Sequence, residues 1–144
     1  KLYIVNTKIT RSANENLQNI KDEKSSFNQI KNILNITDNF INQSKGLNNK
    51  EIEDLLNYSM IKAWDIKKKM IGVLNEDLMN IEQKLKNNGF SVLKLLGAGG
   101  GGYFLVKYED EDNQFNNSLS NIKRFGLDIK EVNISKEGCT AWEC

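Results

Sequence analysis

One run organises this sequence: Val92-Leu-Lys-Leu-Leu-Gly-Ala-Gly-Gly-Gly-Gly-Tyr-Phe-Leu-Val-Lys-Tyr-Glu109. The segments 92–96 and 103–108 are rich in β-branched and aromatic residues and too short for independent helices, so both are predicted to be strands. A hairpin can turn in about two residues, so a six-residue loop of glycine and alanine must serve another purpose. Glycine allows positive φ and close approach, and consecutive exposed N–H groups form a concavity that suits an anion. We therefore predict that a phosphate, or a partner holding one, faces Gly97, Ala98, Gly99, Gly100, Gly101 and Gly102.

Three well-known phosphate-binding motifs do not fit this run. The letters from Gly97 to Gly102 satisfy the dinucleotide pattern G-x-G-x-x-G, but that motif leads from a strand into a helix, and here a second strand follows. A Walker loop ends in Gly-Lys-Ser/Thr, whereas Gly102 is followed by Tyr103 and Phe104. The protein-kinase loop requires later H-R-D and D-F-G segments, which the sequence after Gly102 lacks. All three are excluded.

The run from Lys94 to Val106 resembles the third conserved motif of the GHMP small-molecule kinases. Within that family it is most similar to the D-glycero-D-manno-heptose 7-phosphate kinase branch. That branch also has a helix with Trp followed by a Lys pair, like Ala-Trp-Asp-Ile-Lys-Lys at 63–68, and an opening strand like 5–13. One difference lies at 91–93, where heptose kinases usually have Gly-Gly and this chain has Ser-Val-Leu. Together the three matches span most of the chain.

The resemblance implies a phosphotransferase that uses ATP and Mg²⁺ in its full-length form. It would transfer the γ-phosphoryl group to a hydroxyl of a sugar or sugar phosphate, with heptose 7-phosphate favoured and a fucose-type or mevalonate/phosphomevalonate-type acceptor as alternatives. In this family the phosphate loop, the metal ligands and the catalytic residue belong to the N-terminal domain. Residues 1–144 would therefore be a single C-terminal domain with no catalytic residue, metal ligand or bound cofactor of its own. Its partner would be its N-terminal kinase domain, and alone it would be inactive. The start at Lys1 also suggests a piece of a longer protein or a processed protein.

Six residues outside the loop become substrate-binding candidates through this resemblance: Thr10, Arg11, Trp64, Lys67, Lys68 and Lys94. Arg11 ends a predicted strand where a helix begins, and a helix N-terminus together with an arginine favours an anion. Trp64 and Lys68 lie four residues apart and share a helix face. Solvated charges at a helix end are the alternative interpretation of the lysines. We also expect a Gly101→Asp change to abolish activity in the full-length enzyme without unfolding it.

The composition limits the partners. Twenty basic and nineteen acidic residues give a net charge of +1, so neither nucleic acid nor an anionic membrane is favoured. No apolar run could span a bilayer, and no signal peptide is visible. Cys139 and Cys144 make a poor metal site in a chain without histidine, and we expect a reducing cytoplasm. Association into a homodimer stays open.

The order of predicted elements indicates the fold. Strands are expected at 2–7, 92–96, 103–108 and 127–134, with a short extension at 140–142. A first helix is expected from Ser12, which forms a capping box with Glu15. A later helix is expected to begin after the cap Asn75 and to end at Gly89. The other helices are expected at 26–43, 50–71 and 112–125. Without the extra helices the order is strand, helix, strand, strand, helix, strand. It predicts an α+β fold: a ferredoxin-like split βαβ, four-stranded antiparallel sheet with extra helices in the first crossover.

Two further expectations concern side chains. The helix at 26–43 places Phe27, Ile30, Ile33, Leu34, Phe40 and Ile41 on one broad apolar face. Tyr103, Phe104 and Trp142 are predicted to be core residues. A non-enzymatic module is the competing class of function: a ferredoxin-like domain that binds a small ligand through its glycine loop, or one that dimerises.

Overall fold

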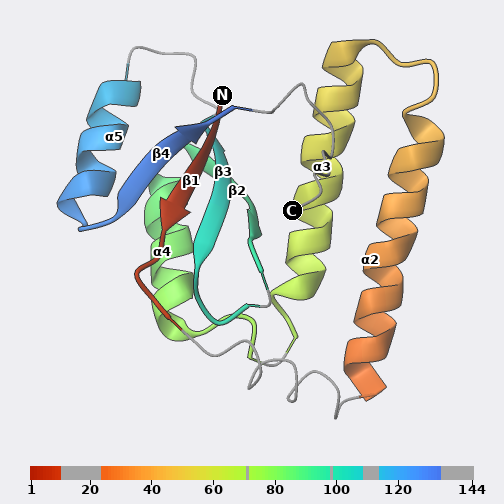
Figure 1. Ribbon diagram of the computed structural model, residues 1–144, viewed down its shortest axis with the longest axis horizontal. Helices are drawn as coiled ribbons and strands as arrows, with labels where there is room; N and C mark the ends of the chain where they lie inside the picture. Colours follow the sequence, from red (N-terminus) through yellow and green to blue (C-terminus); the bar gives the residue numbers. More distant parts are fainter. Residues whose placement is uncertain (11–23, 71, 98, 109–113, 134–144) are drawn as a thin grey trace, which may run out of the picture.

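The computed structural model describes residues 1–10, 24–70, 72–97, 99–108 and 114–133 (Figure 1). The strands are β1 (Leu2–Asn6), β2 (Phe90–Leu95), β3 (Tyr103–Tyr108) and β4 (Asp128–Val132). The helices are α2 (Lys24–Gln43), α3 (Asn49–Lys67), α4 (Glu76–Asn87) and α5 (Phe115–Arg124). The predicted helix from Ser12, the extension at 140–142, and the residues Arg11, Ala98, Cys139 and Cys144 lie outside the described part.

The four strands form one antiparallel sheet in the order β2-β3-β1-β4. β1 pairs with β3 on one side and with β4 on the other, and β2 is an edge strand. The crossover from β1 to β2 contains α2, α3 and α4, whereas α5 alone is described between β3 and β4. This is the predicted ferredoxin-like split βαβ arrangement with extra helices in its first crossover.

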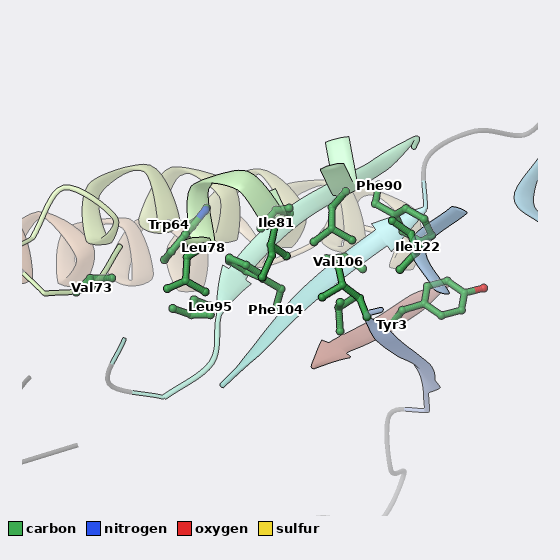
Figure 2. Close-up of a cluster of buried hydrophobic side chains, with 14 of the residues drawn as sticks. Tyr3, Trp64, Val73, Leu78, Ile81, Phe90, Leu95, Phe104, Val106 and Ile122 are labelled. Atoms are coloured by element: carbon green, nitrogen blue, oxygen red, sulfur yellow. The ribbon is translucent and has the colours of Figure 1, made fainter. Parts of the chain in front are cut away.

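The core lies on one face of the sheet, where Figure 2 shows buried side chains such as Leu78, Phe104 and Ile122 gathered. Alternation along each strand sends every second side chain to that face. Tyr3 and Val5 do so from β1, and Phe104 and Val106 from β3, all with at most 4% of their surface exposed. The helices contribute Trp64 from α3, Leu78, Ile81 and Leu85 from α4, and Ile122 from α5.

β2 contains a bulge. Val92 pairs with Val106, but the next pairs are Lys94 with Leu105 and Leu95 with Phe104, so Leu93 is the additional residue. Such an insertion shifts the alternation of the residues that follow it. Lys94 consequently shares the face of Leu105, opposite to the core, and Leu95 shares the face of Phe104.

The two local signals predicted for α4, its cap and its stop, act as predicted. The side chain of Asn75 accepts a hydrogen bond from the N–H of Leu78 at 2.8 Å, which caps α4. Gly89 and Gly126 follow α4 and α5 with φ of 78° and 77°. α3 ends at Lys67 instead of the predicted 71, because tight turns with bonds from Lys69 N–H to the Ile66 carbonyl and from Met70 N–H to the Lys67 carbonyl replace its last turn.

α2 and α3 form a hairpin in which α3 lies along β2 and α2 lies on the outside (Figure 1). A capping box between Asn48 and Glu51 starts α3. The apolar face predicted for α2 is buried only in part. α3 is the one helix that packs against α2 in the described structure, and it half-buries Ile33, Ile36 and Phe40. The rest of the apolar face is exposed: Phe27, Ile30, Leu34 and Ile41.

Phe104 is fully buried as predicted, but Tyr103 is not a core residue. It is 44% exposed because it pairs with Asn6 on the face opposite to the core. Among the described helices, none combines the length and the apolar composition needed to cross a membrane.

Candidate functional site

The glycine loop joins β2 to β3 and lies against two other segments of the chain. One is the turn before α4, where the carbonyl of Val73 accepts a hydrogen bond from the N–H of Gly100 at 2.8 Å. The other follows β1, where the carbonyl of Ile9 accepts a bond from the N–H of Gly102 at 2.9 Å. The two loop N–H groups are therefore already used, and the prediction of a row of free N–H groups is wrong at these positions.

Thr7 holds the end of the loop. Its N–H and its hydroxyl both donate to the carbonyl of Gly102, at 2.9 and 2.7 Å. Thr7 is almost fully buried, and its oxygen also accepts a bond from the N–H of Ile9 at 3.3 Å. The segment that the sequence analysis associated with substrate therefore serves, at Thr7, to fix the loop. Thr10 is exposed at the end of this segment.

Close packing explains two of the glycines. A Cβ atom on Gly99 would lie 2.8 Å from the Cα of Val73, and one on Gly101 would overlap the carbonyl group of Ile9. Real Cβ atoms do not approach the backbone so closely, so a side chain at either position would force the segments apart. We therefore expect Gly101→Asp to destabilise the fold as well as to affect activity.

Gly97 forms the outer part of the loop. It has φ of 81°, and a Cβ atom added there would meet no atom within 4 Å. Its carbonyl accepts a hydrogen bond from Nζ of Lys67 at 2.6 Å. Lys67 is the last residue of α3, so the end of this helix is tied to the exposed side of the loop.

Lys67 and Lys94 lie together beside this outer part. Burial lowers the pKa of Lys67 from its ordinary value of 10.5, and the charge of Lys94 lowers it further. Within the described part of the chain, neither amine forms an ion pair with a carboxylate. Two neighbouring ammonium groups without a carboxylate favour an incoming anion, because the anion reduces their mutual repulsion.

The same two lysines line a cavity of about 250 Å³ between α2 and α3. The rest of its wall is largely apolar: Ile33, Ile36, Phe40, Leu56, Met60 and Ala63. Two hydroxyl groups, of Thr37 and Ser59, add to the lining. A basic rim thus meets an apolar recess at the end of α3.

Lys68 belongs to a different cluster. Its amine lies 2.7 Å from Asp65 and 3.6 Å from Glu82, and Lys86 lies 2.6 Å from the same Glu82 oxygen. Burial works to lower the pKa of Lys68, but the hydrogen bond to Asp65 and the charge of Glu82 outweigh it, so the pKa is raised. The hydrogen bond from Lys68 in turn lowers the pKa of Asp65. The structure therefore separates Lys68 from Lys67 and pairs it internally.

Glu82 was missed by the sequence analysis. It is buried on α4 at a position between Leu78 and Leu85 that belongs to the apolar stripe, and that position was the available signal. A buried carboxylate requires a partner, and lysines from two helices supply it.

Trp64, another candidate, is 2% exposed and packs edge-on against Phe104 with ring centroids 5.9 Å apart (Figure 2). It is thus a core residue, although its ring also borders the cavity. Within the described structure, its indole N–H has no hydrogen-bond partner.

Among the described residues, no group of three or more His, Cys, Asp or Glu side chains could hold a metal ion. A comparison of the chain with protein-family models gives no match, and neither does a comparison with curated proteins.

Proposed function

We propose that this chain is the C-terminal domain of a GHMP-type, ATP-dependent small-molecule kinase, and that Lys67 and Lys94 hold a phosphate group in its cleft. The observation that carries the proposal is the convergence of these two amines beside Gly97, without a carboxylate partner among the described residues. The sequence similarity of 94–106 to the third GHMP motif and the split βαβ topology support the same conclusion.

The two ammonium groups are less stable without a bound anion than with one. Desolvation penalises the ammonium form of Lys67, and the charge of Lys94 adds to the penalty. A phosphate group near both amines converts this repulsion into attraction and accepts charge-assisted hydrogen bonds. A phosphate in transfer carries its charge on three equatorial oxygens, and such positioned cations stabilise it.

The loop has a changed role in this proposal. Because the N–H groups of Gly100 and Gly102 donate to the carbonyls of Val73 and Ile9, respectively, they anchor the loop and do not donate hydrogen bonds to phosphate. The loop instead presents its outer part, and the carbonyl of Gly97 orients the amine of Lys67. The inner glycines pack closely against Ile9 and Val73, so the loop is held rigidly and its outer surface can contact a second domain.

The remaining parts of the reaction would come from a preceding domain. In the family that this chain resembles, ATP and its Mg²⁺ are held by the preceding domain, and we propose the same division here. We infer transfer of the γ-phosphoryl group to a hydroxyl of a sugar or sugar phosphate. Heptose 7-phosphate is the favoured acceptor, with fucose-type and mevalonate-type acceptors as alternatives.

The test uses the protein that contains this chain together with its preceding domain. Release of ADP is measured with heptose 7-phosphate, fucose, mevalonate and phosphomevalonate as acceptors. Lys67→Met is expected to lower kcat/KM for the accepted substrate about 100-fold, since one charge-assisted contact to the phosphate is lost. Lys68→Met is the matched control and should change kcat/KM less than about threefold, because Lys68 is paired internally.

Two results would contradict the proposal at different levels. A natural protein without a phosphate-loop domain, or one that phosphorylates none of these acceptors, would overturn the kinase assignment. Equal losses in the Lys67 and Lys68 variants would leave the family open but remove the assigned site.

A further inference from the structure

The exposed apolar side chains of α2 are regularly spaced. Phe27, Leu34 and Ile41 follow one another at intervals of seven residues, and Ile30 lies three residues after Phe27. Their exposed fractions are 70%, 58%, 52% and 42%, respectively. We refer to these four residues as the α2 stripe. A period of seven residues places side chains in a seam along one side of a helix, which is the pattern of a helix that packs against another helix.

The α2 stripe is distinct from the contact with α3. Ile33, Ile36 and Phe40 serve that contact and are half-buried. At about 100° per residue, their mean direction lies roughly a third of a turn from that of Phe27, Leu34 and Ile41. α2 therefore has two apolar sides, of which the described structure covers one.

The charges of α2 are few and are placed beside the stripe. Lys24, Lys31 and Asp38 are the charged residues among the twenty of this helix. Lys31 follows Phe27 by four residues, and Asp38 follows Leu34 by four, so both occupy the same position of the seven-residue repeat. Both are exposed, and neither forms an ion pair within the described part of the chain. A helix surface with depleted charge and a central apolar row has the composition of an interface core.

The α2 stripe can pair with the α2 stripe of a second copy when the two helices run antiparallel. If two copies of α2 cross antiparallel with Leu34 against Leu34, then Phe27 of each meets Ile41 of the other. Lys31 lies three residues before this centre and Asp38 four residues after it. The two opposite charges of the two copies are then level to within one residue, about 1.5 Å of helix rise. A parallel pair would instead place like charges at the same level.

We propose that the α2 stripe is the interface of a two-fold symmetric homodimer, in which the α2 helices of two copies pack antiparallel. A two-fold interface uses the same surface on both subunits, and self-complementarity of this kind is its requirement. Each interface contains two Lys31–Asp38 pairs, which specify the antiparallel direction more than they add affinity. The site at Lys67 and Lys94 lies on other elements, so dimerisation is independent of the proposed function.

Sedimentation velocity of the full chain across the micromolar range tests the dimer. The wild type is expected to dimerise. Leu34→Asp, which places two like charges at the two-fold centre, is expected to raise the dissociation constant at least about 100-fold. Asn32→Asp is the matched control, because it adds the same charge to an exposed position on another side of α2, and it should leave the dimer unchanged. Circular dichroism should show all variants folded, since Leu34 is more than half exposed.

A charge exchange tests the direction. Lys31→Asp and Asp38→Lys should each weaken the dimer about tenfold, and the double variant should recover most of the loss, because the exchanged charges meet again only in the antiparallel pair. A monomeric wild type would overturn the proposal, including the case in which α2 is covered by a preceding domain or another protein. A dimer that Leu34→Asp leaves intact, or a double variant without recovery, would also overturn it.

Discussion

The two halves of the glycine loop differ in what surrounds them. The inner half, Gly99–Gly102, is bonded to the carbonyls of Val73 and Ile9 and contacts the backbone at both places. At the outer half, a Cβ atom on Gly97 would meet nothing, and a lysine amine binds its carbonyl. A run of similar letters thus serves two purposes. The inner glycines let three segments meet, and the outer one leaves a surface at which Lys67 and Lys94 converge.

The largest expected effect separates the two halves directly. Gly101→Ala should lower the free energy of unfolding by about 3 kcal/mol, because its Cβ overlaps the carbonyl of Ile9 and strains the neighbouring Gly102 bond. Gly97→Ala should cost only about 1 kcal/mol, the conformational penalty of positive φ. Urea unfolding of both variants provides the measurement. Similar losses for the two would show that the halves do not differ in packing.

A smaller effect tests how the inner half is held. Asn75 caps α4, and its amide nitrogen lies 3.5 Å from the carbonyl of Gly100. Asn75→Ala should cost about 1 kcal/mol through the lost cap. Asn75→Asp keeps an acceptor for the Leu78 N–H and should stay within about 0.5 kcal/mol of the wild type, because the bond to Gly100 is long and weak. Thermal unfolding of the two variants measures the difference. A large loss of stability in Asn75→Asp would mean that the hydrogen bond from the Asn75 amide to the Gly100 carbonyl holds the loop.

The smallest effect concerns the outer half. The pKa of Lys67 is lower in the folded protein than its ordinary value of 10.5. Between the folded pKa and the unfolded pKa, the unfolded chain therefore binds more protons than the folded protein. Stability should therefore rise with pH in that window relative to a Lys67→Met variant. Lys94→Gln should raise the pKa of Lys67 and reduce this rise, with a change of a few tenths of a kcal/mol at neutral pH after screening by solvent. An unchanged pH profile in Lys94→Gln would mean that the two amines do not interact.

The periodic signals were sufficient for the architecture. The β-branched and aromatic residues of 103–108, the cap Asn75 and the stop Gly89 identified elements that the structure contains, and the order of the predicted elements indicated the sheet. The end of α3 was misplaced, because the apolar pattern of the sequence continues to Met70, which is buried although it lies in a turn.

The site was less predictable than the fold. Lys67 and Lys68 are adjacent at the end of α3, and their roles differ because Asp65 and Glu82 pair with Lys68. Lys67 instead donates to the carbonyl of Gly97. The support of the loop comes from the carbonyls of Ile9 and Val73, and a backbone group carries no residue-specific signal. The sequence therefore identified the glycine loop correctly as unusual but not the neighbours that require it.

The bulge at Leu93 has a consequence for how reliably the hairpin aligns. In a regular strand, counting by twos from Phe90 and Val92 would turn Lys94 into the apolar core on the other face of the sheet, where an ammonium group deprived of water costs several kcal/mol. Mispairing of β2 by one position is therefore disfavoured by the amine itself as well as by the exposure of leucines. The positive charge of Lys94, which we assign to phosphate recognition, would then also favour the native register of β2 over a register shifted by one residue.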